Sequence, residues 1–271
     1  MVEKKFIVWA LGLTLAVGVL AYGAVLAWIY VQQERLLFFP TPLPATHRFD
    51  LPGVTEVQVP VSGGHFLSAL HYRQAQPKGL IFFLHGNAGD LKLWLTSTDF
   101  YRDAGFDLFM IDYRGYGKSS GRIESEAQLH ADVRAAWSAV GAHYAGKKVV
   151  LYGRSLGSGL AADLATQVSA DLLILVSPYT SLTAMARSHY PWVPSSLMRY
   201  PLNTEASLRR TRLPVLILHG EEDELIPVSH AVTLQTVRPG IELIKVPGAG
   251  HGDIHQFERY EQALKARLAG L

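Results

Sequence analysis

A serine enclosed by glycines, between a strand pattern and a helix pattern, constrains this chain more than any other feature. Residues 149–152 form a short apolar run, as expected of a buried strand, and the stretch after Gly157 has the composition of a helix. Gly153-Arg154-Ser155-Leu156-Gly157 joins the two. Glycines let strand and helix backbones approach closely, and such an elbow pushes the serine hydroxyl above the sheet. An ordinary strand-to-helix turn is the alternative, so residues elsewhere in the chain must distinguish a nucleophile elbow from such a turn.

The rest of the chain alternates apolar runs with helical patterns. Continuous apolar runs, typical of strands buried on both faces, occupy residues 80–84, 106–111, 172–176, 213–218 and 241–246. Helical patterns lie between most of them, at residues 91–104, 124–145, 157–169, 228–237 and 255–269. This order predicts an α/β fold, with a mostly parallel central sheet and helices on both faces. Alternating residues 54–61 and 66–72 predict an antiparallel hairpin at one edge.

The N-terminal segment reads as a membrane helix. Residues 6–31 contain no charge, and as a helix they would extend about 39 Å, against a hydrocarbon core of about 30 Å. A signal peptide is the alternative, but its apolar region usually has only about 7–15 residues. We therefore expect one uncleaved transmembrane helix in contact with lipid. Lys4 and Lys5 favour a cytoplasmic N-terminus, with the rest of the chain extracytoplasmic, in a periplasmic or lumenal compartment.

These patterns divide the chain into an anchor at residues 1–31, a connector at 32–53 and one domain at 54–271. The connector contains Leu36-Leu37-Phe38-Phe39, followed by prolines 40, 42 and 44, and we expect no regular helix there. Residues 178–212 form an insertion between two predicted strands, where lids often occur. Its aromatic residues and prolines predict a short cap, and a surface helix pair is the alternative.

Composition excludes several classes of function. The chain has no cysteine, which rules out disulfides, thiolate metal sites and a cysteine nucleophile. Its net charge of +2 over 271 residues gives no sign of a nucleic-acid partner. His251 and His255 have the spacing of a metal pair on a helix, but no H-E-x-x-H pattern or third ligand accompanies them. We expect no metal.

A catalytic triad emerges from the residues that follow the predicted strands. In open α/β sheets the ligand site lies beyond the carboxyl ends of the strands. A serine hydroxyl needs a base to take its proton, commonly a histidine oriented by a carboxylate. Ser155, Asp223 and His251 each follow a strand, in the order Ser-Asp-His. The neighbouring acids Glu221, Glu222 and Glu224 are the alternatives to Asp223.

The same reasoning predicts an oxyanion hole of two backbone N–H donors. The first belongs to Leu156, directly after the serine and at the start of the predicted helix. For the second we choose Asn87, in the turn after the strand at residues 80–84, although its side chain could instead only pin that turn.

Taken together, these motifs resemble the α/β-hydrolase superfamily. The resemblance rests on Leu84-His85-Gly86-Asn87-Ala88-Gly89, Asp112-Tyr113-Arg114-Gly115-Tyr116-Gly117-Lys118-Ser119, the elbow, Ser177-Pro178-Tyr179-Thr180-Ser181 and Gly248-Ala249-Gly250-His251. It is nearest to the membrane-anchored branch with depalmitoylase-like proteins, although the chain lacks their cysteine-rich N-terminus. The resemblance implies hydrolysis of an ester, thioester or amide without a cofactor, by Ser155 as nucleophile, Asp223 as acid and His251 as base.

The sequence therefore predicts a membrane-anchored serine hydrolase. It would cleave carboxylic esters or thioesters of small to medium acyl groups through an acyl-enzyme. An amidase or peptidase with the same triad is the nearest alternative. A catalytically silent scaffold on the same fold is a further one, although such a scaffold has no physical need for all three triad groups.

Overall fold

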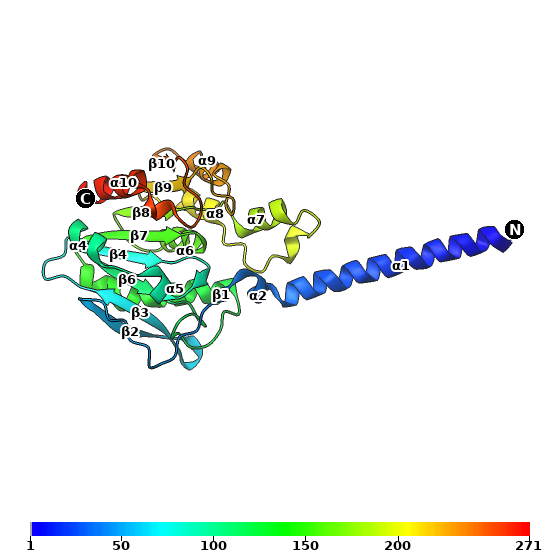
Figure 1. Ribbon diagram of the computed structural model, residues 1–271, viewed down its shortest axis with the longest axis horizontal. Coiled ribbons are helices and arrows are strands. Elements are labelled where there is room, and N and C mark those ends of the chain that lie inside the picture. The colour runs from blue at the N-terminus through cyan, green and yellow to red at the C-terminus, as the bar shows by residue number, and fades with distance from the viewer. Residues whose placement is uncertain (1) are drawn as a thin grey trace.

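The computed structural model describes residues 2–271 and is built on one eight-stranded sheet (Figure 1). The strands lie in the order β10-β9-β8-β7-β4-β6-β3-β2. β3 pairs antiparallel with both β2 and β6, and every other neighbouring pair in this sheet is parallel. The predicted α/β fold is confirmed, with the hairpin at one edge. The bounds are β2 (Val54–Val61), β3 (His65–Tyr72), β4 (Gly79–Leu84), β6 (Phe106–Ile111), β7 (Lys148–Arg154), β8 (Leu172–Val176), β9 (Val215–Gly220) and β10 (Ile241–Val246).

Helices cover both faces of this sheet because its central strands are apolar on both sides. In β4, Leu80, Phe82 and Leu84 join one buried cluster, and Ile81 and Phe83 join the other, as the two-residue period of a strand requires. The first cluster also takes residues of α5 (Glu126–Val140), α6 (Leu156–Leu164), α8 (Thr204–Arg210) and α9 (Ser229–Gln235). The second takes residues of α3 (Leu91–Trp94), α4 (Asp99–Ala104) and α10 (Glu258–Ala269).

The order of the strands places a crevice at the carboxyl ends of β4 and β7. From β4 the chain crosses to β6 on one side and then returns past β4 to β7 on the other. Such a reversal opens a space between the two loops that leave the neighbouring strands. The elbow follows β7, and the turn with Asn87 follows β4. Topology alone therefore brings these two predicted parts of the site together.

Two expectations about helices are corrected. The helix predicted at residues 91–104 is two short helices, α3 and α4, because Ser97 Oγ accepts the Asp99 N–H and offers the backbone a local alternative. The connector does contain a short helix, α2 (Gln33–Leu37), so the expectation for Leu36 and Leu37 is wrong. Pro40 constrains its own backbone and that of Phe39, so residues 33–37 can still form a helix, and the chain becomes extended at Phe38.

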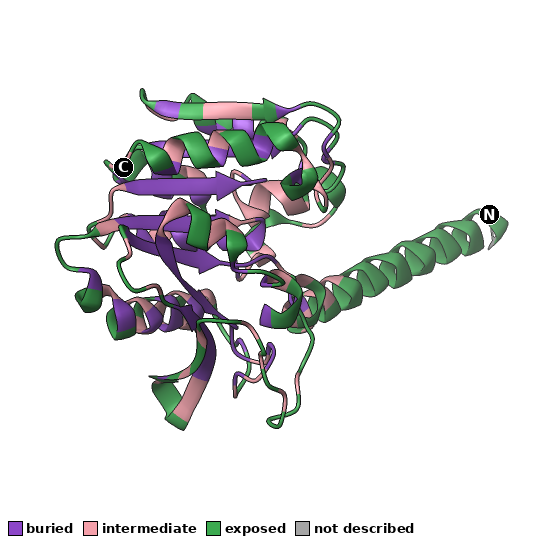
Figure 2. Ribbon diagram, turned by 60° about the vertical axis from the view of Figure 1, so that its left-hand side comes forward, coloured by how far each residue is buried: buried purple, intermediate pink, exposed green. Residues whose placement is uncertain are grey.

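Helix α1 (Val2–Val31) extends away from the domain and is exposed along almost its whole described length (Figure 2). Within residues 2–271 it holds the one helix segment long and apolar enough to cross a membrane, Glu3–Val31, although a signal sequence passes the same test. After α2, the two-residue strand β1 (Phe39–Pro40) pairs with β5 (Ala88–Gly89). The predicted cap region contains α7 (Leu182–His189), a 3₁₀ turn (Ser195–Leu197) and α8.

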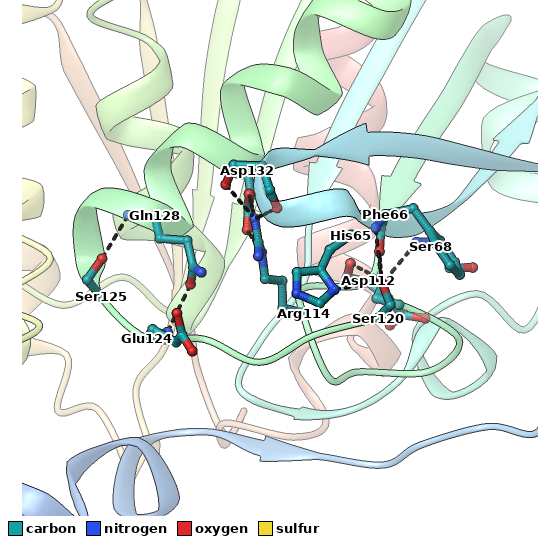
Figure 3. Close-up of polar contacts among 12 residues, drawn as sticks. His65, Phe66, Ser68, Asp112, Arg114, Ser120, Glu124, Ser125, Gln128 and Asp132 are labelled. Carbon is teal, nitrogen blue, oxygen red and sulfur yellow. Dashed lines mark hydrogen bonds and ion pairs between the residues drawn. The ribbon is translucent and has the colours of Figure 1, made fainter.

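The loop after β6, residues 112–125, is held by a buried ion pair (Figure 3). Arg114 Nε donates to Asp132 Oδ2 at 2.6 Å and Nη2 donates to Asp132 Oδ1 at 2.9 Å, with side-chain exposures of 3% and 5%. Asp132 lies on α5, so the pair ties this loop to a helix of the first cluster. Ser120 Oγ also accepts the Phe66 N–H of β3 at 2.9 Å. The loop is therefore rigidly placed beside the crevice.

This ion pair yields a prediction about stability. Asp132→Asn should lower the free energy of unfolding by about 3 kcal/mol, because it leaves a buried guanidinium without a counter-charge. Urea unfolding of the full chain in detergent measures it. Glu205→Gln is the matched control: its pair with Arg209 is exposed, so the loss should stay below about 1 kcal/mol. Equal losses in the two variants would contradict the assigned importance of the buried pair.

Candidate active site

The elbow holds Ser155 in a strained backbone conformation. Ser155 has φ 53° and ψ −121°, outside the regions that residues with a Cβ normally occupy. The glycines around it are required by contact. A Cβ at Gly153 would lie 2.4 Å from the Gly157 carbonyl oxygen, and one at Gly157 would lie 2.0 Å from the Leu84 carbonyl oxygen. Strand β7, helix α6 and strand β4 thus meet too closely for any side chain, and Ser155 stands at their junction.

Ser155, His251 and Asp223 form a continuous chain of hydrogen bonds. Ser155 Oγ lies 3.0 Å from His251 Nε2, and His251 Nδ1 lies 2.8 Å from Asp223 Oδ2. Because the carboxylate accepts the proton on Nδ1, Nε2 is left as an acceptor facing the serine hydroxyl. The Asp223 side chain is fully buried, whereas that of His251 is 23% exposed. The geometry is that of a nucleophile, a base and an orienting acid.

Asp223 is fixed as a carboxylate by its surroundings. Burial alone would raise its pKa, but hydrogen bonds from His251 and from the Ile226 N–H, with the charge of His251, outweigh burial and lower the pKa. Its Oδ1 accepts the N–H groups of Leu225 and Ile226, at 3.1 and 2.8 Å. The alternatives Glu221, Glu222 and Glu224 are all exposed, and the carboxylate that meets the His251 ring in residues 2–271 is that of Asp223.

The two predicted oxyanion donors lie in the turn after β4 and at the start of α6, two segments that approach each other at Ser155. Within residues 2–271, the N–H groups of Leu156 and Asn87 donate to no protein acceptor. Leu156 opens α6, where the first N–H groups have no intrahelical partner. The Asn87 turn approaches the elbow, since a Cβ at Gly86 would lie 3.3 Å from Ser155 Cβ. Two free donors beside a serine are the arrangement that a developing oxyanion requires.

The orientation of the Asn87 peptide is set by side chains. His85 Nδ1 lies 2.7 Å from the Gly86 carbonyl oxygen and donates to it. Because C=O and N–H of one trans peptide point in opposite directions, this bond turns the Asn87 N–H away from the His85 ring. His85 therefore has a specific role: it fixes the plane of the peptide that carries the candidate second donor.

Two tyrosines that sequence analysis did not single out hold the same turn. Tyr113 Oη donates to the His85 carbonyl at 2.8 Å, and Tyr116 Oη donates to the Asn87 carbonyl at 2.6 Å. Both rings are fully buried. Both tyrosines belong to the loop that the Arg114–Asp132 ion pair holds. The ion pair therefore supports the Asn87 turn indirectly, through these tyrosines. The available signal was two tyrosines three residues apart in a polar stretch after an apolar strand.

Arg154 is a further residue missed in the sequence. Its Nη2 donates to the carbonyls of His251 and Gly252, both at 3.1 Å. The residue before the candidate nucleophile therefore holds the loop that carries the candidate base. Asp253 pins that loop from within, since its Oδ1 accepts the Gly250 N–H at 2.8 Å. Across residues 2–271 no group of three or more potential metal ligands gathers, around His251 and His255 or elsewhere.

The strain at Ser155 can be measured without reference to activity. Ser155→Gly and Ser155→Ala both remove Oγ, but only glycine removes the Cβ that disfavours φ 53°. Relief of about 1–3 kcal/mol of strain, less about 0.5–1 kcal/mol of chain entropy, should leave the glycine variant more stable by about 1 kcal/mol. Urea midpoints of the two variants compare them. A more stable alanine variant would show that the elbow is not strained.

Comparison with known proteins places the chain in a family. The family described as serine aminopeptidase, S33 matches residues 75–201, which include Ser155 but end before Asp223. An uncharacterized protein of Mycobacterium tuberculosis is 32% identical over 249 residues, covering 88% of this chain and 87% of that protein. Alpha/beta hydrolase domain-containing protein 17B of Xenopus laevis is 36% identical over 200 residues, covering 71% and 67%.

Structural similarity agrees with these relatives. The solved structure of an esterase from Pyrococcus furiosus, Pf2001, superposes with a TM-score of 0.67 at 18% sequence identity, covering 86% of this chain and 97% of that one. At this identity the likeness concerns the fold. The motifs quoted from the sequence, the sheet order and the relatives lead to one conclusion: the chain belongs to the α/β-hydrolase superfamily.

Proposed function

We propose that this protein is a membrane-anchored serine hydrolase that cleaves carboxylic esters or thioesters through an acyl-enzyme. The observation that carries the proposal is the unbroken chain from Ser155 Oγ through His251 to the buried Asp223, at 3.0 and 2.8 Å. It stands opposite two N–H groups that have no other protein acceptor in residues 2–271. A scaffold without activity would gain nothing from a strained serine or from free donors.

The proposed reaction needs only groups of this chain and water. His251 Nε2 takes the hydroxyl proton as Ser155 Oγ attacks the carbonyl carbon, and the N–H groups of Leu156 and Asn87 stabilise the oxyanion. The imidazolium, stabilised by Asp223, then gives its proton to the departing oxygen or sulfur, and the acyl group remains on Ser155. Water attacks this ester in the same way, with His251 as base, and releases the acid.

The cap region favours an ester or thioester over a peptide. An aminopeptidase must neutralise the ammonium group of its substrate, which requires a carboxylate near the cleft. Residues 178–212 contain one acidic residue, Glu205, and it pairs with Arg209 at 2.7 Å. The same region contains Met185, which is half-buried and apolar, as suits contact with an acyl group. An amidase or peptidase is the second candidate, because the triad serves both reactions and a serine aminopeptidase family matches part of the chain.

Removal of the proposed nucleophile is the first test. Ser155→Ala should lower turnover by about 10⁶, because no other group can form the acyl-enzyme. The assay uses p-nitrophenyl esters of graded chain length beside the matching anilides, so that it also separates esterase from amidase. Circular dichroism controls for folding. Wild-type rates in a folded Ser155→Ala variant would refute the proposed role of the elbow.

The proposed acid can be distinguished from its neighbour. Asp223→Asn should lower turnover by about 10⁴, because an amide cannot hold His251 in the required tautomer. Glu222→Gln is the matched control: Glu222 is exposed on the same loop, and its variant should hydrolyse esters at the wild-type rate. The reverse ranking of the two variants would assign the acid to Glu222.

The anchor is proposed on the length and exposure of α1. Full-length protein should stay in the membrane during alkaline carbonate extraction, and a chain shortened to start at Gln32 should be released with its esterase activity intact. We propose a cytoplasmic N-terminus, so protease added to spheroplasts should digest the domain. A soluble mature protein lacking α1 would identify the segment as a signal peptide instead.

A further inference from the structure

The cap is attached to the anchor as well as to the domain. Tyr22 Oη in α1 donates to the Trp192 carbonyl at 2.7 Å, and the two rings lie 6.5 Å apart. The guanidinium of Arg199 lies 5.5 Å from the ring of Tyr30. Figure 1 shows the chain after α7 descending beside the end of α1. These contacts join segments about 170 residues apart.

The contact follows one face of the helix. Tyr22, Leu26 and Ile29 are spaced by four and three residues, which places them on one stripe of α1, and Gln33 opens α2 directly after the turn at Gln32. Leu26 and Ile29 are half-buried among exposed neighbours, and Gln33 is buried. Gln33 Nε2 donates to the Leu197 carbonyl at 2.9 Å, and the Arg199 N–H donates to Gln33 Oε1 at 2.6 Å. The stripe shows that α1 is seated against the cap at a defined rotation.

The contact between the cap and α1 places the end of the cap inside the expected membrane, beyond the interface nearer the domain. Trp9 and Trp28 are nineteen residues apart in α1, about 28 Å, close to the thickness of a hydrocarbon core of about 30 Å. Tryptophan and tyrosine gather at the two membrane interfaces, so Trp28 and Tyr30 mark the interface nearer the domain. Tyr22 lies six residues before Trp28, about 9 Å deeper along the helix axis. Trp192, bonded to Tyr22, lies at that depth.

The segment at this depth, residues 189–194, which we call the cap tip, suits apolar surroundings. Tyr190 and Trp192, two residues apart, are 57% and 49% exposed, and neighbouring exposed aromatic rings are typical of a membrane contact site. Lipid also requires that backbone polar groups have partners. Pro191 and Pro194 carry no N–H, the Tyr190 N–H donates to the Ala186 carbonyl at 2.7 Å, and the Val193 N–H donates to the Tyr190 carbonyl at 3.0 Å. Few backbone N–H groups of the cap tip would therefore lack a hydrogen-bond partner in lipid.

We propose that the cap tip inserts, beside α1, into the membrane leaflet nearer the domain, and that the enzyme takes its substrate from that leaflet. The substrate class is an amphiphile whose acyl chain lies in the bilayer and whose ester or thioester lies at the surface. This inference rests on the proposed function. The only partner it invokes is the lipid bilayer, and the depth of about 5–10 Å is that of other interfacial segments.

The root of the cap connects this surface to the active site. Tyr179 Oη donates to the Leu156 carbonyl at 3.0 Å, one residue after Ser155. The Leu202 N–H donates to Glu126 Oε2 on α5 at 2.9 Å, and Tyr200 Oη donates to Glu34 Oε1 of α2 at 2.7 Å. The cap is thus fixed at its root to the elbow and at its tip to the anchor. When the cap tip is inserted in a membrane, the distance between the membrane surface and Ser155 is therefore fixed.

Insertion can be tested directly because the chain has no cysteine. Tyr190→Cys in the full-length protein, labelled with an environment-sensitive fluorophore, is reconstituted into phosphatidylcholine vesicles. Ala266→Cys, exposed on α10 at the opposite end of the molecule from α1, is the matched control. We expect a blue-shifted emission for the label at position 190, and quenching by lipids with a nitroxide near the headgroup end of the acyl chain. Aqueous emission at both positions would overturn the proposal.

Activity provides the second readout. The double variant Tyr190→Ala/Trp192→Ala keeps the backbone contact with Tyr22 but loses both rings. Its kcat/KM on a long-chain ester embedded in vesicles should fall on the order of tenfold, and its rate on p-nitrophenyl acetate in solution should not change. Val232→Ala on α9, another exposed apolar residue, should change neither.

The outcomes separate the two proposals. Equal losses on the embedded and the soluble ester would show that the tip supports the site itself, and would overturn the role assigned to the bilayer. Hydrolysis of neither ester by the wild-type protein would refute the proposed function, while the label at position 190 would still report whether the tip is in lipid.

Discussion

The structure depends on the close approach of three backbones around Ser155. A Cβ at Gly157 would come within 2.0 Å of the Leu84 carbonyl oxygen, and a Cβ at Gly153 within 2.4 Å of the Gly157 carbonyl oxygen. This contact brings the end of β7, the start of α6 and the end of β4 to one point. The serine is forced into φ 53°, and two backbone donors are left without a protein acceptor among residues 2–271. The chemistry that we propose follows from this packing.

The turn after β4, the loop after β6 and the loop that carries His251 are each fastened from another part of the chain. Tyr113 and Tyr116 hold the turn after β4, and a buried ion pair holds the loop that carries them. Arg154 holds the loop of His251. In the proposed reaction, donors and a base that are already held in place would need little reorganisation, which is the main source of electrostatic catalysis. The same loops would otherwise be the most mobile part of such a fold.

Much of this could be predicted from sequence because it depends on local patterns. Apolar runs identified the six strands from β4 to β10 of the main sheet, and the order of Ser155, Asp223 and His251 identified three side chains that the structure brings into contact. Contacts between segments that are far apart in the chain produce no local pattern in the sequence. Nothing local joins Gln33 to Arg199, or Tyr22 to Trp192, and the supporting role of the tyrosines depends on where the loop after β6 folds. Leu36 and Leu37 are helical because the restriction that Pro40 imposes does not reach back to them.

The central claim is that Ser155 is an activated nucleophile in the folded protein. A fluorophosphonate probe reacts only with a serine whose proton a base can take, so the adduct reports the whole arrangement in one experiment. Mass-spectrometric mapping of the full-length protein after reaction in vesicles should find the adduct on Ser155, and heat-unfolded protein should carry none. An adduct on another serine, or none on the folded protein, would contradict the account.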